Sequence, residues 1–158
     1  MTVRIICVGK LKEAYLRDAF SEYSKRISRF CSFEVTELSE YKLPDSPSEA
    51  QVQKAVAEES AVILRTIQKN DYVIALDVGG TQLSSEEFSS RMSAAFMNSS
   101  SIAFVIGGSN GYNDAVRARA NLRLSFSKMT FPHQLFRIML AEQIYRAFKI
   151  ASGEKYHK

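Results

Sequence analysis

The sequence is poor in the residues and patterns that several protein classes require. Its 158 residues include only two cysteines, which are too few for a disulfide framework, and only two histidines, which rule out a multi-histidine metal site. No apolar run approaches the roughly 20 residues that cross a bilayer, and the first residues do not form a secretory signal. We therefore expect a cytoplasmic protein with no metal, no membrane span and no catalytic thiol.

Internal repeats and low-complexity tracts are also absent. Hydrophobic residues make up 46% of the chain and charged residues 24%, which is the balance of an ordinary protein with a substantial core. A chain of this length is typical of one compact domain. We expect residues 1–158 to form a single domain.

The positive charge is concentrated near the C-terminus. The net charge of the chain is +4, yet the segment 117–158 alone holds nine basic and two acidic residues. A basic surface attracts polyanions, because each neutralised phosphate releases condensed counterions. The segment is either a docking surface for nucleic acid or a solvated basic face, and charge alone does not decide between them.

The apolar pattern predicts alternating strands and helices. Short apolar runs predict strands at 3–8, 33–38, 72–76, 102–106 and 122–125. Helical spacing predicts helices at 13–28, 48–68, 85–98, 113–120 and 132–152. Two of them begin at capping-box pairs, Ser48 with Gln51 and Ser84 with Glu87. Because the central apolar runs are continuous rather than alternating, they predict an α/β fold with a mostly parallel sheet between helices.

Three loops follow the carboxyl ends of predicted strands, where parallel sheets bind their ligands. They span 77–80, 107–111 and 126–132. The middle loop reads G-G-x-x-G, which is neither the dinucleotide motif G-x-G-x-x-G nor a phosphate-binding loop with its lysine. We expect a ligand at this edge of the sheet, but the residues alone leave the reaction open.

The last predicted helix is apolar around most of its circumference. Its apolar residues lie at 135, 136, 138–140, 144, 145, 148 and 150. A helix of this kind is buried on more than one side, either at a twofold subunit interface or in the centre of its own domain. We favour the interface, and hence a homodimer.

Five segments of the chain match one family of enzymes. They are Val8–Lys12, Phe104–Gly111, Ser125–Gln134, Glu142–Ile150 and Gly153–Lys158. Together they resemble the SPOUT-class methyltransferases that modify N3 of a pseudouridine in bacterial large-subunit ribosomal RNA. The resemblance covers essentially the whole chain. It implies a deep trefoil knot in the C-terminal part, S-adenosylmethionine as cofactor, a homodimer, and large-subunit rRNA of the assembled ribosome as substrate.

The resemblance also implies roles for individual residues. The positions that match the cofactor site are Leu76, Gly107, Gly108, Phe126, Ser127, Lys128, Met129, Thr130 and Phe131. His157 is the leading candidate for contact with the target base, and Tyr156 and Glu142 are further catalytic candidates. Candidates for contacts with RNA phosphate are Arg137, Arg146, Lys155 and Lys158. On the residues alone, Leu76 and Met129 could equally be core residues, and Glu142 with Arg146 could be a surface ion pair.

Other functions stay open. A related enzyme could methylate transfer RNA or another ribosomal nucleotide, and a ribosome-binding or assembly factor could retain a vestigial cofactor pocket. A nicotinamide-dependent oxidoreductase is disfavoured by the missing dinucleotide motif. Saturable affinity for S-adenosylmethionine separates an enzyme from a pure binding factor.

Overall fold

The computed structural model of the chain describes residues 1–154 and 156. Its strands are β1 (Thr2–Val8), β2 (Ser32–Leu38), β3 (Tyr72–Gln82), β4 (Ser101–Ile106) and β5 (Leu122–Ser125). Its helices are α1 (Ala14–Ile27), α2 (Glu49–Thr66), α3 (Ser85–Asn98), α4 (Asp114–Arg119) and α5 (His133–Ala151). The alternation of strands and helices is as predicted. In the described part of the chain, no helix combines the length and apolarity that a membrane span needs.

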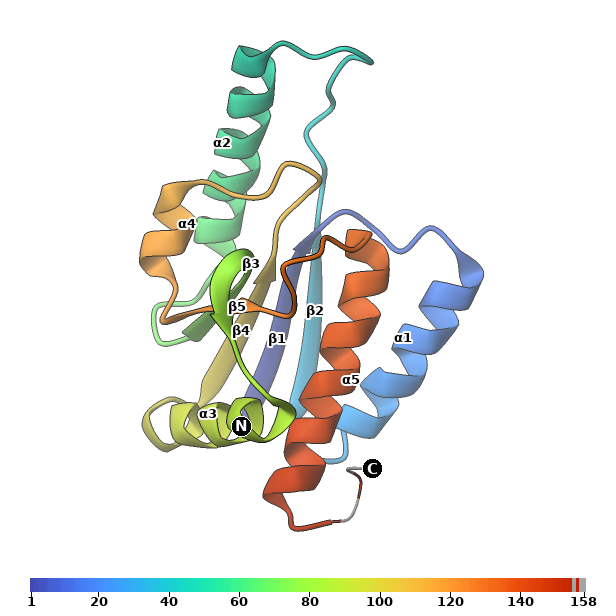
Figure 1. Cartoon of the computed structure of the whole chain (residues 1–158), viewed down its shortest axis with the longest axis vertical. Helices are drawn as coiled ribbons and strands as arrows, with labels where there is room; N and C mark the ends of the chain where they lie inside the picture. Colours follow the sequence, from blue (N-terminus) through green and yellow to red (C-terminus); the bar gives the residue numbers. More distant parts are fainter. Residues whose placement is uncertain (155, 157–158) are drawn as a thin grey trace.

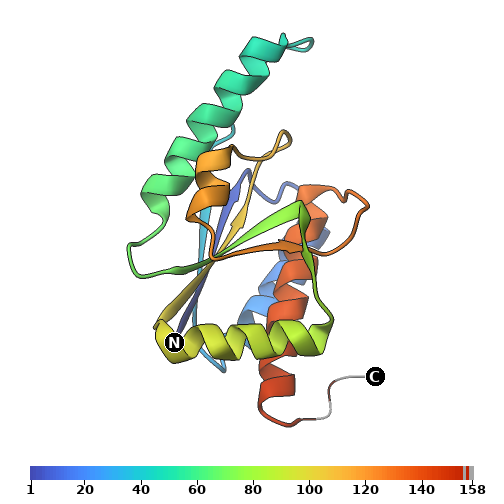
Figure 2. The ribbon, with the colours of Figure 1, turned by 60° about the vertical axis from the view of Figure 1, so that its left-hand side comes forward.

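The strands form one sheet in the order β2-β1-β4-β3-β5, and every neighbouring pair is parallel. Helices α1, α3 and α5 cover one face, while α2 and α4 cover the other (Figures 1 and 2). The predicted α/β fold, with a parallel sheet between helices, is confirmed. The deep trefoil knot that the resemblance implies stays a prediction.

The central strands are continuously apolar because both faces of the sheet are covered. In β4, Ile102, Phe104 and Ile106 join the core under α3 and α5, whereas Ala103 and Val105 join the core under α2 and α4. This division follows from the alternation of side chains along a strand. The edge strand β2 is largely exposed, so its alternating pattern overstated its burial.

Strand β3 is longer than the sequence predicted. We expected it to end at Leu76 and the chain to turn away at 77–80, but it continues to Gln82 alongside β5. Its register shifts between Leu76 and Thr81, which accommodates the irregular segment. A Cβ on Gly80 would lie 2.6 Å from the carbonyl oxygen of Arg123, so only glycine permits this approach of two backbones.

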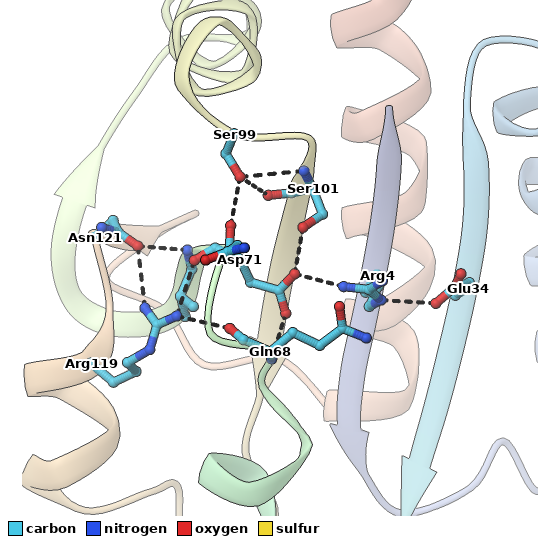
Figure 3. Close-up of polar contacts among 10 residues, drawn as sticks. Arg4, Glu34, Gln68, Asp71, Ser99, Ser101, Arg119 and Asn121 are labelled. Carbon is cyan, nitrogen blue, oxygen red and sulfur yellow. Dashed lines mark hydrogen bonds and ion pairs between the residues drawn. The ribbon is translucent and has the colours of Figure 1, made fainter.

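A hydrogen-bonded cluster ties the sheet together at the amino ends of its strands (Figure 3). The side chain of Asp71 is completely buried and accepts hydrogen bonds from Arg4 (2.6 Å), from the Ser101 hydroxyl (2.6 Å) and from the Gln68 backbone N–H (2.8 Å). Arg4 also donates to Glu34 on β2 at 2.8 Å. One carboxylate therefore connects β1, β4 and the turn before β3, at the end of the sheet opposite the three predicted ligand loops.

Helix α2 extends well beyond the sheet and carries the segment 39–48 at its far end (Figures 1 and 2). Both predicted capping boxes form. Ser48 accepts from the Gln51 N–H at 3.2 Å and its own N–H donates to the Gln51 side chain at 2.8 Å. Ser84 and Glu87 make the same reciprocal pair at the start of α3. Such caps satisfy N–H groups that the helix leaves unpaired, which suits a projecting helix end.

Candidate functional site

A pocket of about 180 Å³ lies beside residues 76–78 in the middle of β3 and at the carboxyl ends of β4 and β5. We call it the loop pocket. It is lined by Leu76, Asp77, Val78, Ile106, Gly107, Gly108, Gly111, Tyr112, Leu124, Phe126, Ser127, Met129, Thr130, Phe131, His133 and Phe136. Every residue that we predicted for the cofactor site lines it except Lys128, which is exposed. Residues more than 50 positions apart in the sequence thus share one site.

The glycine loop forms one wall of the loop pocket. The Gly111 N–H donates to the Gly108 carbonyl at 2.9 Å, and Gly111 has a φ of 75°, a conformation that favours glycine. A Cβ on Gly107 would lie 2.9 Å from the carbonyl carbon of Gly111. The tight turn therefore excludes side chains at this wall, which leaves backbone N–H and C=O groups at the pocket.

The loop after β5 forms a second, aromatic wall. The Phe126 ring packs edge-on against Phe136 with centroids 4.8 Å apart, and Phe131 stacks on Phe136 at 6.4 Å. The loop is held by Ser127, whose hydroxyl accepts from the Met129 N–H at 3.0 Å. Met129 itself is 73% exposed, so it is not the core residue that the sequence allowed as an alternative. This wall suits a flat, apolar ligand group.

A charged network around Asp77, which lines the pocket, connects β3 with α4 and β5. Asp77 accepts hydrogen bonds from Arg117 (3.2 Å), from Arg123 (3.1 Å) and from the Gly79 N–H (2.9 Å). Burial alone would raise the pKa of Asp77, but these three donors together hold that pKa below its ordinary value. One carboxylate therefore connects the segment 77–79 with α4, which follows the glycine loop, and with β5, which precedes the loop 126–132.

Tyr112 links two of these loops directly. Its ring is buried beneath Arg117, 5.2 Å from the guanidinium carbon, and its hydroxyl donates to the Leu76 carbonyl at 2.8 Å. Burial raises the pKa of Tyr112, so the hydroxyl keeps its proton and remains a donor at neutral pH. The Leu76 backbone, a predicted cofactor contact, is thereby fixed from behind. The sequence pattern marked Asp77 as the first residue of a ligand loop but gave it no individual role, and it did not single out Tyr112, which directly follows the glycine loop.

A second and larger pocket of about 450 Å³ adjoins the first. We call it the helix pocket. It is lined by Tyr23, Leu83, Ser84, Ser85, Phe88, Leu124, Ser125, Phe126, Ile138, Met139, Glu142 and Gln143. Leu124 and Phe126 belong to both pockets. The helix pocket thus lies between the start of α3 and the middle of α5, directly beside the loop pocket.

Two of the predicted catalytic residues lie at the helix pocket or beyond it. Glu142 lines it and accepts two hydrogen bonds from Arg146, at 3.0 and 2.7 Å. The ring of Tyr156 lies 4.8 Å from the guanidinium carbon of Arg146 and packs on Tyr145. Burial, with Glu142 nearby, raises the pKa of Tyr156. The structure therefore brings Glu142, Arg146 and Tyr156 together, but not at the loop pocket. His157, Lys155 and Lys158 lie outside the described residues.

The prediction that Arg137 contacts RNA phosphate is contradicted. Arg137 is 2% exposed, and its guanidinium donates to Glu37 at 2.6 Å and to the Gly9 carbonyl at 2.9 Å. Its charge is already matched by Glu37, and a phosphate cannot reach it from solvent. Through these two contacts, Arg137 instead connects the start of α5 with β2 and with the turn after β1.

The remaining candidates for chemistry are weak. His133 lines the loop pocket, and its Nε2 lies 3.8 Å from a Glu40 carboxylate oxygen. Burial raises the pKa of Cys7 and of Cys31 to about 11, so both thiols are protonated at neutral pH. Within residues 1–154 and 156, no group of His, Cys, Asp and Glu side chains is arranged to hold a metal ion.

Comparison with known proteins gives a consistent result. The chain matches the family described as "Predicted SPOUT methyltransferase" over residues 1–157. The protein named Ribosomal RNA large subunit methyltransferase H from Clostridium beijerinckii is 53% identical over 159 residues, and the alignment covers 100% of both chains. A protein of the same name from Streptococcus equi subsp. zooepidemicus is 50% identical with the same coverage.

Among solved structures, a candidate RNA methyltransferase from Bacillus anthracis aligns with a TM-score of 0.50 over 99% of each chain. Its sequence identity is 10%, so this likeness concerns the fold alone. The family match, in contrast, spans nearly the whole chain and includes the three loops of the loop pocket. The chain therefore belongs to the SPOUT methyltransferase family.

Proposed function

We propose that the protein methylates N3 of a pseudouridine in large-subunit ribosomal RNA, with S-adenosylmethionine as the methyl donor. The observation that carries this proposal is the loop pocket, where residues from three separate loops gather at the positions that resemble a cofactor site. Support for the substrate comes from full-length relatives about half identical in sequence that are named ribosomal RNA large subunit methyltransferases.

The loop pocket fits part of S-adenosylmethionine. Its walls are apolar and aromatic, and the glycine loop offers backbone groups, which suits a flat adenine ring. Its volume of about 180 Å³ is smaller than the roughly 300–1,000 Å³ usual for ligand pockets, so the rest of the cofactor would lie at the open mouth. Leu76, Gly107 and the loop 126–131 would hold it. When bound, the cofactor supplies an electrophilic methyl group.

The protein's own contribution is orientation and removal of a proton. A methyl group transfers directly when donor and acceptor are held in line, and the acceptor imide nitrogen must lose its proton to a nearby group. Glu142, Tyr156 and His157 are our candidates for contact with the target base. Arg146, Lys155 and Lys158 are proposed to contact RNA phosphate, with Lys128 at the rim of the loop pocket.

We also propose that the protein works as a homodimer. Helix α5 is flanked by α1 and α3, so most of its apolar circumference is already covered within one protomer. Exposed apolar side chains nevertheless lie at or next to the loop pocket: Val78 (52% exposed), Met129 (73%) and Phe131 (36%) line it, and Leu135 (42%) lies in the first turn of α5, between the lining residues His133 and Phe136. A second copy would cover them. Leu135→Asp should then convert the protein to monomers in sedimentation velocity, whereas Met97→Asp, at an 85% exposed position on α3, should not.

The substrate is proposed to be the assembled ribosome, which places the protein in the cytoplasm. A compact α/β domain gains specificity from the shape of its target, and a folded ribosomal site provides such a shape. The test is transfer of labelled methyl from S-adenosylmethionine to ribosomes that lack the modification, beside separated subunits and naked RNA. Label on pseudouridine in assembled ribosomes supports the proposal. Cofactor binding without label on any RNA favours a binding factor, and absence of cofactor binding refutes the proposal.

A further inference from the structure

The helix pocket has no role in the proposed function, because the proposed cofactor site is the loop pocket. It is the larger of the two adjoining pockets and shares Leu124 and Phe126 with the loop pocket. Two other pockets, one beside Glu59 and one beside Arg17, share no lining residue with the loop pocket. Reacting atoms must approach to about 3–3.5 Å before a methyl group can transfer. The acceptor therefore belongs in a cavity that shares a wall with the donor site, and the helix pocket is such a cavity.

The apolar lining of the helix pocket suits an unstacked nucleobase. Tyr23, Phe88 and Phe126 contribute aromatic rings from α1, α3 and the loop after β5. Proteins that recognise single RNA bases commonly hold them against aromatic side chains. A volume of about 450 Å³ is within the range of small-ligand pockets and leaves room for a base together with its ribose.

The polar side chains of the helix pocket are oriented by one another. The Ser85 hydroxyl donates to Oε1 of Gln143 at 2.8 Å, and Nε2 of Gln143 donates to Oε2 of Glu142 at 2.9 Å. Arg146 occupies the other oxygen, Oε1, of Glu142. This chain of contacts fixes the orientation of the amide. It leaves the second N–H of Gln143 and a remaining lone pair of Glu142 free to meet a ligand.

We propose that the helix pocket receives the acceptor base, a uracil-type ring, and that Gln143 and Glu142 recognise its imide edge. This inference rests on the proposed function. A uracil-type ring presents an N–H between two carbonyl groups. The Glu142 carboxylate accepts from that N–H, and the Gln143 amide donates to a flanking carbonyl. A cytosine-type ring carries a lone pair instead of the N–H, which a carboxylate repels, so the same pair of residues rejects it.

The reaction balances with these groups. The N3 proton first passes to the carboxylate of Glu142, which leaves the electron pair of the N–H bond on N3. That pair then forms the new N3–C bond as the S–C bond breaks, and the sulfur keeps the electrons of the S–C bond. Gln143 is a specificity residue in this scheme, and Ser85 is a positioning residue that acts through it. Tyr156 lies at the outer end of the same series of contacts, because its ring packs on Arg146 and Arg146 bonds Glu142.

The test uses Gln143→Met, which keeps the length of the side chain but removes its two hydrogen bonds within the protein, with Ser85 and Glu142, and the proposed one to the base. We expect kcat/KM for ribosomes to fall about tenfold to a hundredfold, the range for one lost hydrogen bond in a buried site. The dissociation constant for S-adenosylmethionine, measured by calorimetry, should stay within about twofold of wild type. Ser85→Ala should give a smaller loss in the same direction. Gln53→Met makes the same chemical change on the exposed surface of α2 and should leave both quantities unchanged.

Each other outcome overturns the inference. Wild-type kcat/KM in Gln143→Met would mean that no base is recognised there. Weakened cofactor binding would assign the helix pocket to the cofactor, and a change from dimer to monomer in sedimentation would assign it to a subunit contact. If wild-type protein binds the cofactor but labels no ribosome, the proposed function itself fails, which this series distinguishes because the wild type is measured first.

Discussion

The buried carboxylate of Asp71 should contribute far more to stability than its exposed neighbour Glu34. Both bind Arg4, at 2.6 and 2.8 Å, but the side chain of Asp71 is 0% exposed and that of Glu34 is 52% exposed. Asp71→Asn keeps the volume of the side chain and removes its charge. Glu34→Gln makes the same change at the other carboxylate. Comparing the two variants therefore isolates the effect of burial on the stability that each carboxylate contributes, because both carboxylates bind the same arginine.

The expected magnitudes follow from the surroundings of each carboxylate. Breaking a buried ion pair typically costs 3–5 kcal/mol. Arg4 would retain Glu34, so we take the lower end and expect Asp71→Asn to lose about 3 kcal/mol of unfolding free energy. An exposed pair contributes less than about 1 kcal/mol. For a chain of this length, Asp71→Asn should lower the Tm by about 6–12 °C, and Glu34→Gln should lower it by at most about 4 °C.

Urea unfolding followed by circular dichroism at neutral pH measures both losses. Protein concentration must be equal in all samples, because self-association stabilises the folded state. The m-value should not change, since neither substitution alters the surface exposed on unfolding. Equal losses in the two variants would refute the reasoning, as would a loss below about 1 kcal/mol for Asp71→Asn. Cofactor affinity should be unaffected in both, because the cluster lies at the opposite end of the sheet from the loop pocket.

Three further predictions concern the loop pocket. Tyr112→Phe removes the hydrogen bond to the Leu76 carbonyl and should weaken S-adenosylmethionine binding about threefold to tenfold in calorimetry; unchanged affinity would contradict the positioning role. The pKa of Asp77 is lowered in the folded state, so its contribution to stability is complete at neutral pH and is lost as pH falls below about 4. Urea unfolding should therefore show Asp77→Asn as destabilised at neutral pH and equal to wild type in strong acid. Gly107→Ala places a Cβ 2.9 Å from the carbonyl carbon of Gly111, a backbone atom that cannot move aside without opening the turn, and should reduce cofactor affinity at least tenfold. Gly79→Ala, whose Cβ meets nothing closer than 3.5 Å, serves as its control.

Local signals allowed accurate prediction of the secondary structure. Helix α3 spans Ser85–Asn98 as predicted, because its start is fixed by the capping pair Ser84 and Glu87, three residues apart. Strand β5 also has its predicted bounds, Leu122–Ser125. Continuous apolar runs indicated which strands lie between two helical layers, since both faces of those strands are covered.

What the sequence could not provide was long-range pairing. We predicted that Arg137 contacts RNA phosphate because the sequence shows its charge but not its partner. That partner is Glu37, which lies 100 positions earlier in the chain. The extension of β3 past Leu76 depends on the backbone of Arg123, also distant in sequence. The family resemblance predicted the residues of the loop pocket. The helix pocket, in contrast, depends on the packing of α3 beside α5, which no local sequence pattern indicates.

Helix α5 sets the distance between the proposed cofactor site and the proposed acceptor site. It begins at His133 beside the loop pocket, passes Glu142 in the helix pocket, and ends at Ala151 before the tail, a rigid length of about 28 Å. Adding or deleting one residue within it would rotate everything beyond by about 100° and shift it by about 1.5 Å. Evolution of this enzyme should therefore keep the length of α5 constant, whereas the exposed residues 44–47, which precede the cap of α2, can gain or lose residues.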